Sequence, residues 1–147
     1  MLLRMHQTSS LIVSVRSTPC APLRVILTEG RGRGVVAERD LTAGELLERA
    51  PVIIIPESDR AAIDSTNVGN YIFMWEHGCT GNDLYTGAGR AAVVLGFASL
   101  VNHSDTPNCD TVRHIDALAH DLMALRPIAS GEELTIDYGM TLWFKPV

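Results

Sequence analysis

The sequence has 147 residues, which is the length of one compact domain and too short for two hydrophobic cores. Its apolar fraction of 46% and charged fraction of 20% are typical of a globular protein and exclude a wholly disordered chain. Twelve basic residues face 17 acidic ones, so the net charge of −5 argues against a general nucleic-acid binder and favours a cationic partner.

The charge is unevenly divided between the start of the chain and the rest. Residues 1–28 contain three arginines and no acid, whereas residues 29–147 contain nine basic and 17 acidic residues, a net charge of −8. Residues 1–22 are rich in Ser and Thr and are expected to form a disordered extension; a true start at Met5 and a weak organelle presequence are the alternatives. We therefore expect one folded domain at 23–147, ending in a short tail.

The cysteines and the apolar runs favour an intracellular protein without a membrane span. Three widely spaced cysteines with no C-x-x-C pair are typical of a reduced compartment. The longest uncharged apolar stretch, 91–101, has eleven residues, whereas a spanning helix needs about 20.

Short strand patterns bounded by Gly and Pro dominate the chain. Apolar and β-branched runs predict strands at 23–28, 35–37 and 52–55, and Pro51 and Pro56 are expected to fix both ends of the last one. The remaining expected elements are a helix at 57–65, a strand or helical turn at 71–75, a loop at 80–90, a strand at 91–95, a helical turn at 97–101, a hairpin with arms at 108–114 and 120–126, and a strand at 134–138.

Three segments could carry chemistry, and each has a plainer structural interpretation. The glycine-rich stretch 30–34 lets a backbone approach a ligand, but it fits neither the dinucleotide fingerprint nor a P-loop and could be an ordinary turn. The polar cluster 102–109 follows a buried run, so its side chains either brace a loop or hold a ligand. The stretch 131–139 is a turn and strand that ends in a tyrosine.

In this order, the three segments resemble the SET domain family of lysine methyltransferases. The matching motifs are Gly-Arg-Gly at 32–34, Asn-His-Ser-x-x-Pro-Asn at 102–108 and Gly-Glu-Glu-Leu-Thr-x-Asp-Tyr-Gly at 131–139, and the resemblance covers about residues 23–143. It is greatest to the small stand-alone SET proteins of viruses and bacteria. It implies a β-rich α+β fold of several small sheets, with a C-terminal pseudoknot that brings the second and third motifs together.

The resemblance also implies roles for individual residues. Tyr138 is the expected catalytic tyrosine, and Tyr71 is the candidate for a second tyrosine in the lysine channel, ahead of Tyr85. Phe97 and Ile136 are expected to wall that channel. The residues expected to bind S-adenosylmethionine are Arg31, Gly32, Arg33, Gly34, Asn102, His103, Tyr138 and Trp143, with Phe144 as an alternative cover for the adenine.

The implied activity is S-adenosylmethionine-dependent methylation of a lysine in a basic protein or peptide, such as a histone tail. A catalytically inactive SET-like interaction module and an enzyme with a non-protein acceptor are the alternatives. No direct nucleic-acid or membrane partner is expected, and the chain is expected to be a monomer or homodimer in the cytoplasm of a bacterium or the nucleus of a eukaryote. Many SET proteins bind zinc through cysteines that follow the third motif, and this chain has no cysteine after Cys109. The histidines and aspartates of 114–121 fall on mixed faces of the expected hairpin, so no metal is expected there either.

Overall fold

The computed structural model describes residues 21–28, 30, 32–76 and 89–139. These residues form many short strands and few helices, as the sequence predicts. The helical elements are α1 (Arg60–Asp64) and the 3-10 turns η1 (Glu57–Asp59), η2 (Asn67–Tyr71) and η3 (Phe97–Leu100). The strands are β1 (Leu23–Thr28), β2 (Gly32–Ala37), β3 (Leu46–Ile55), β4 (Ile72–Met74), β5 (Ala91–Val94), β6 (Asn102–His103), β7 (Cys109–His114), β8 (Ala119–Ala124) and β9 (Thr135–Ile136).

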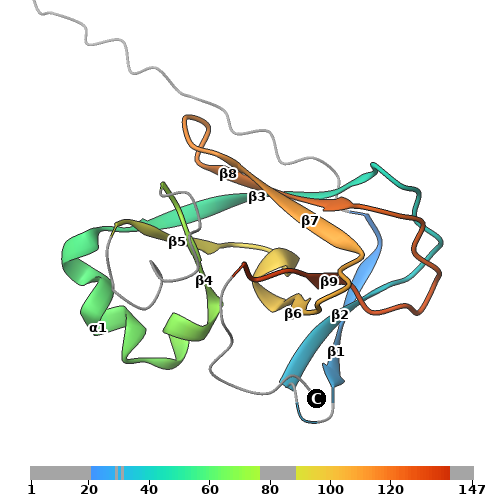
Figure 1. Cartoon of the computed structure of the whole chain (residues 1–147), viewed down its shortest axis with the longest axis horizontal. Coiled ribbons are helices and arrows are strands. Elements are labelled where there is room, and N and C mark those ends of the chain that lie inside the picture. Colours follow the sequence, from blue (N-terminus) through green and yellow to red (C-terminus); the bar gives the residue numbers. More distant parts are fainter. Residues whose placement is uncertain (1–20, 29, 31, 77–88, 140–147) are drawn as a thin grey trace, which may run out of the picture.

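The strands form three small sheets (Figure 1). β1 and β2 are an antiparallel hairpin, and five strands form a larger sheet in the order β4-β5-β3-β8-β7. The third sheet is the parallel pair β6-β9. None of the helices in the described part of the chain has the length and apolar character of a membrane-spanning segment.

The sequence prediction was wrong about Pro51, which lies inside β3 and does not begin it. Residues of β3 up to Pro51 pair with β8, and those from Val52 onward pair with β5. Because the strand changes partner at this point, the missing N–H of proline removes no hydrogen bond that either ladder needs. Pro51 still accepts a hydrogen bond from the Leu95 N–H through its carbonyl, at 3.0 Å.

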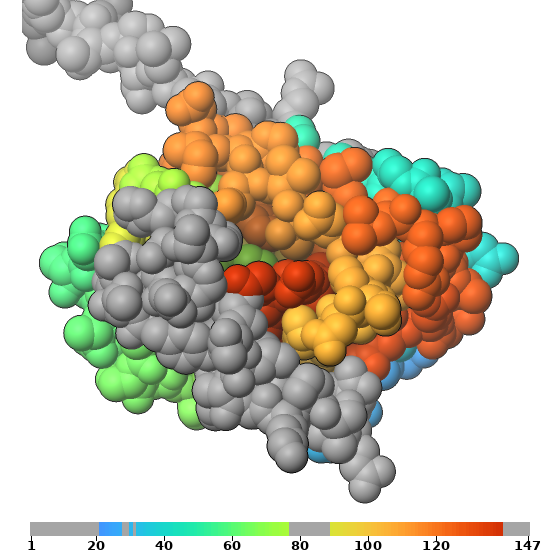
Figure 2. All heavy atoms as spheres, viewed as in Figure 1, coloured from blue at the N-terminus to red at the C-terminus, as the bar shows by residue number. Residues whose placement is uncertain are grey.

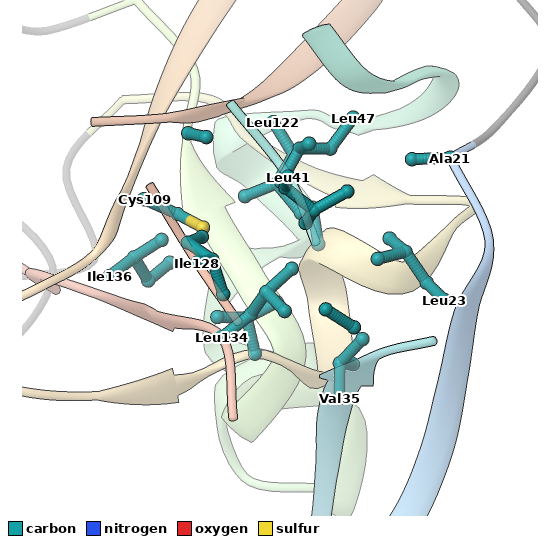
Figure 3. Close-up of a cluster of buried hydrophobic side chains, with 14 of the residues drawn as sticks. Ala21, Leu23, Val35, Leu41, Leu47, Cys109, Leu122, Ile128, Leu134 and Ile136 are labelled. Atoms are coloured by element: carbon teal, nitrogen blue, oxygen red, sulfur yellow. The ribbon is translucent and has the colours of Figure 1, made fainter. Parts of the chain in front are cut away.

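The hydrophobic core lies between the β1–β2 hairpin, β3, β8 and the segment that leads to β9 (Figure 3). Its side chains come from both the first and the last described strands, so the last strands are fixed by packing as well as by hydrogen bonds. The residues labelled in Figure 3 are Ala21, Leu23, Val35, Leu41, Leu47, Cys109, Leu122, Ile128, Leu134 and Ile136.

Packing begins two residues before the expected start of the domain at Leu23. The Ala21 N–H donates to the Leu47 carbonyl at 2.7 Å, and the Pro22 carbonyl accepts from the Glu38 N–H at 2.9 Å. Ala21 is also buried in the core. The proposed extension lies, apart from these two residues, outside the described residues.

The two outer strands of the larger sheet are bridged by a side chain. Arg113 on β7 donates from Nη1 to the Met74 carbonyl at the end of β4, at 2.7 Å. Nearby, the rings of Phe73 and His120 lie 4.6 Å apart. Because β4 and β7 are the two edge strands of this sheet, the contact between them shows that the sheet is strongly curved.

Candidate functional site

The parallel pair β6-β9 brings together the second and third sequence motifs. Asn102 is paired with Thr135 and His103 with Ile136, and the Ser104 N–H continues the ladder to the Ile136 carbonyl at 3.0 Å. This pairing is the juxtaposition that the expected pseudoknot requires. Figure 1 shows β6 and β9 side by side near the middle of the molecule.

Asn108 braces this arrangement from inside. Its side chain is 1% exposed and donates to Glu132 Oε1 at 3.0 Å and to the Glu133 carbonyl at 2.8 Å. Its Oδ1 accepts from the Thr135 N–H at 2.8 Å. A buried amide with both its donors and its acceptor satisfied gives this segment one defined position.

Asn102 lies at the edge of β6 and uses both of its side-chain N–H groups within the protein. Nδ2 donates to Glu133 Oε1 at 2.7 Å and to the Arg33 carbonyl at 3.2 Å. Its Oδ1 accepts no hydrogen bond from the described residues, so the amide presents an acceptor to a ligand. Arg33 belongs to the glycine-rich stretch, which therefore meets the second motif directly.

Tyr138 is held in place by contacts of its backbone and of its side chain. Its backbone N–H donates to His103 Nδ1 at 3.2 Å, and its ring lies 5.3 Å from the ring of His103. Its hydroxyl donates to the Val101 carbonyl at 3.0 Å. Burial, with a smaller contribution from Tyr71, raises the pKa of Tyr138 above its usual value. The phenol is therefore protonated at neutral pH and keeps an oxygen lone pair free to accept a hydrogen bond.

His103 is buried, and both of its ring nitrogens have partners in this network. Nδ1 accepts from the Tyr138 N–H, and Nε2 lies 3.1 Å from Asp105 Oδ1. Asp137 accepts from the Gly139 N–H at 2.8 Å. The segment around Tyr138 is thus ordered by side chains from both motifs.

Tyr71 lies close to the glycine-rich stretch and to Tyr138. The Arg33 guanidinium carbon is 5.2 Å from the centre of the Tyr71 ring, which is within the range of a cation–π contact. The sequence predicted backbone contacts for Arg33 but gave no sign of this side-chain stacking. The structure therefore brings Arg33, Tyr71 and Tyr138 to one place.

The two expected channel walls differ in their surroundings. Phe97 is partly buried and packs against the core, whereas Ile136 is 2% exposed and belongs to the core itself. Phe97 is positioned by Glu48, a buried carboxylate that the sequence analysis missed. Glu48 accepts the N–H groups of Phe97 at 2.9 Å and of Ala98 at 3.0 Å. No sequence signal pointed to this role, because Glu48 stands next to another charged residue and before the strand expected at 52–55.

Gly96 explains why Glu48 can approach the start of η3 so closely. A Cβ at this position would overlap the carboxylate of Glu48. The strand β3 is thus joined to the turn that leads into Val101 and Asn102, and a substitution at Gly96 would force the Glu48 carboxylate away from its present position.

The face that carries these elements is hollowed (Figure 2). The hollow lies between the orange spheres of the β7–β8 hairpin and the red spheres of the last described segment. In the described ranges, no group of three or more His, Cys, Asp or Glu side chains could hold a metal ion. Arg31, Trp143, Tyr85 and Phe144 lie outside the described residues.

Comparison with known proteins identifies the family. The model of the SET domain matches residues 32–139. The chain belongs to the SET domain family. It is 30% identical over 126 residues to a Schizosaccharomyces pombe histone-lysine N-methyltransferase specific for H3 lysine-37, covering 85% of this chain and 78% of that relative. It is 33% identical over 124 residues to the Xenopus tropicalis N-lysine methyltransferase KMT5A, covering 80% of this chain and 36% of that relative.

A solved structure supports the SET fold independently. A Plasmodium falciparum protein described as a candidate histone methyltransferase superposes with a TM-score of 0.57 at 21% identity, covering 82% of this chain and 99% of that one. The predicted SET fold is confirmed, and the chain is placed among the protein-lysine methyltransferases. The relatives named here come from yeast, frog and a protozoan, so the greater resemblance to viral and bacterial SET proteins stays a prediction.

Proposed function

We propose that this SET domain protein transfers a methyl group from S-adenosylmethionine to the side-chain amine of a lysine in a basic protein. The observation that carries this proposal is the β6-β9 pairing, which places Asn102 and His103 next to Tyr138. All three motif residues are present, whereas an inactive SET-like module would be expected to lack one of them. This favours the enzyme over the interaction module.

The residues around Asn102 suit the cationic amino-acid end of the cofactor. The Asn102 Oδ1 and the Arg33 carbonyl are acceptors, and Gly32, at φ +76°, has no neighbour within 4 Å of the position of a Cβ. S-adenosylmethionine supplies an activated methyl group on a sulfonium. We propose that it is held by Arg31, Gly32, Arg33, Gly34, Asn102, His103, Tyr138 and Trp143.

Tyr138 and Tyr71 are proposed to orient the lysine amine. A free lysine has a pKa of about 10.4 and must lose its proton to attack a methyl group. Partly buried aromatic surroundings disfavour the ammonium form, and the Arg33 guanidinium beside Tyr71 disfavours it further. Because the Tyr138 hydroxyl donates to Val101, its oxygen can accept an N–H of the amine and direct the amine lone pair.

No covalent intermediate with the protein is required, so positioning is the main contribution of this site to the rate. Phe97 is proposed to form the exposed wall of the lysine channel, with Ile136 supporting it from the core.

A basic, lysine-bearing peptide suits the charge of the protein, because residues 29–147 carry a net charge of −8. The name of the Schizosaccharomyces pombe relative points to histones as the substrate class and hence to the nucleus. We propose that the protein is a monomer or a homodimer.

The test combines calorimetric titration of S-adenosylmethionine with methylation of lysine-rich peptide arrays followed by mass spectrometry. We expect cofactor binding and a mass increase of one or more methyl groups on a lysine of a basic peptide. A protein that binds no S-adenosylmethionine at high concentration is the inactive module, and a protein that binds it but modifies no lysine has another acceptor.

A further inference from the structure

Glu133 is an acid at this site that has no cationic partner. Its Oε1 accepts from Asn102 Nδ2 at 2.7 Å, and among the described residues neither of its oxygens meets an Arg or His side chain. The neighbouring Glu132 is different, because its carboxylate lies 2.8 Å from Arg126 and accepts the Ala129 N–H at 3.0 Å. Glu132 therefore holds the turn, whereas Glu133 is directed to Asn102.

The backbone explains why Glu133 faces the site. Glu133 forms a bridge with Val36, and the next residue, Leu134, donates its N–H to the Val35 carbonyl at 2.8 Å. Leu134 is 0% exposed in the core, and successive side chains of an extended segment point to opposite faces. Glu133 therefore projects away from the core and toward Asn102.

The groups that meet here are all hydrogen-bond acceptors. Both N–H groups of the Asn102 amide are used, which leaves the Asn102 Oδ1, the Arg33 carbonyl and the Glu133 carboxylate around one point of the fold. A partly buried carboxylate without a counter-charge is costly, and the cost is removed by a ligand that is cationic and rich in N–H groups. An ammonium group has three N–H donors and no acceptor.

We infer that Glu133 is a cofactor-binding residue, which supplies the negative charge that receives the α-ammonium group of S-adenosylmethionine. This inference rests on the proposed function. It also assigns the Asn102 amide a definite orientation, because its hydrogen bond to Glu133 turns Oδ1 away from that carboxylate and toward the ligand.

The competing explanation is that Glu133 only orients Asn102, and the two explanations differ in their dependence on charge. The α-amino group of S-adenosylhomocysteine is charged at pH 7, whereas an analogue with a hydroxyl in its place keeps a hydrogen-bond donor and carries no charge there. If the carboxylate binds the ammonium, loss of the Glu133 charge weakens the binding of S-adenosylhomocysteine much more than that of the hydroxyl analogue. If Glu133 only holds Asn102, its removal weakens the binding of both ligands by the same factor.

The experiment is calorimetric titration of S-adenosylhomocysteine, and of its analogue with a hydroxyl in place of the α-ammonium, into the full chain at pH 7. The variants are Glu133→Gln, which keeps the size but loses the charge, and Glu132→Gln as the matched control from the same turn. We expect Glu133→Gln to weaken the binding of S-adenosylhomocysteine about tenfold, the effect of about one charge-assisted hydrogen bond. The wild-type protein should bind the hydroxyl analogue about tenfold more weakly than S-adenosylhomocysteine, and Glu133→Gln should bind the two ligands within about threefold of each other.

Each outcome decides between the explanations. Wild-type affinity for S-adenosylhomocysteine in Glu133→Gln, or an equal loss for both ligands, overturns the inference and leaves the proposed function intact. A wild-type protein that binds no S-adenosylhomocysteine overturns both. Glu132→Gln should keep the wild-type preference for S-adenosylhomocysteine over the hydroxyl analogue despite a lower melting temperature. If Glu133→Gln does not fold, Glu133→Asp keeps the charge and must keep this preference; its loss there also overturns the inference.

Discussion

Two groups of charged side chains in this protein differ in how their charges are compensated. On the outer face of the larger sheet, Asp121 is 5% exposed and accepts from Arg49 at 2.7 and 2.6 Å and lies 2.8 Å from His114. The bond from Arg49, with that of His114, lowers the pKa of Asp121. At the candidate site, the Glu133 carboxylate accepts from the Asn102 amide and meets no cationic side chain within the described ranges. The difference indicates that the first group stabilises the fold and the second is completed by a ligand.

The largest expected effect is the loss of turnover in Tyr138→Phe, a change at the candidate site. The variant keeps the ring beside His103 but loses the hydroxyl bonded to Val101, so the lysine amine loses its orienting contact. We expect turnover to fall about 100-fold, as for a misplaced reacting group, with S-adenosylmethionine affinity changed less than about threefold. Methylation kinetics with calorimetry measures both. Near-normal turnover would contradict the role given to Tyr138.

The opposite pattern is expected from Asp121→Ala. Removing the carboxylate leaves Arg49 without its bidentate partner and His114 without its acceptor, and Arg49 is exposed enough to be rehydrated. We expect the free energy of unfolding to fall by about 2–3 kcal/mol. Urea denaturation measures this, and the affinity for S-adenosylmethionine should stay within about twofold of wild type. A large loss of affinity at unchanged stability would show that Asp121 acts in ligand binding and does not stabilise the fold.

His120 extends the comparison to a buried titratable group with no hydrogen-bond partner. Both of its ring nitrogens lack one in the described structure, and burial lowers its pKa to about 4. The unfolded chain takes up this proton below pH 6.5 and the folded chain only below about 4, so stability is lost as the pH falls between these values.

From pH 7 to pH 5 the expected loss from His120 is about 2 kcal/mol. The pKa shift of Asp121 acts in the same direction but at lower pH, below the ordinary value for an aspartate. Urea denaturation at the two pH values, compared with His120→Phe, isolates the histidine. The variant should lose about 2 kcal/mol less than wild type over this range, and an equal loss would show that another group is responsible.

The smallest effect is expected from Glu45→Gln, which tests a compensated pair at the surface. Glu45 pairs with Arg39 and accepts the Thr42 N–H at 3.0 Å, and these contacts lower its pKa to about 2. Solvent screens such an exposed pair, so the expected loss is about 0.5 kcal/mol. The measurement is urea denaturation at low and high salt. A loss as large as that of Asp121→Ala would contradict the expectation that a buried ion pair stabilises the fold more than an exposed one.

Local sequence patterns predicted most elements and part of the site. The hairpin of β7 and β8 and the strand at 23–28 follow from alternation and turn residues, and Asn102, His103 and Tyr138 follow from motif spacing. These features depend on residues close to one another in the chain, or on a pattern preserved across a family.

The features that were missed depend on pairing between distant segments. Pro51 is tolerated inside β3 because the strand changes partner there, which the sequence around Pro51 does not reveal. Glu133 cannot be distinguished from Glu132 until the Val36 bridge fixes which side chain faces Asn102. Glu48 likewise acquires its role from the N–H groups of Phe97 and Ala98.

The parallel pairing of β6 with β9 also has a consequence for folding. Asn102 and Thr135 are separated in the chain by the whole β7–β8 hairpin, and closing such a long loop is slower than forming a local hairpin. During synthesis, the partner of β6 leaves the ribosome only after most of the core strands. We therefore expect the hairpin to form before the β6-β9 pair, so that the chain acquires the capacity to bind a ligand late in folding.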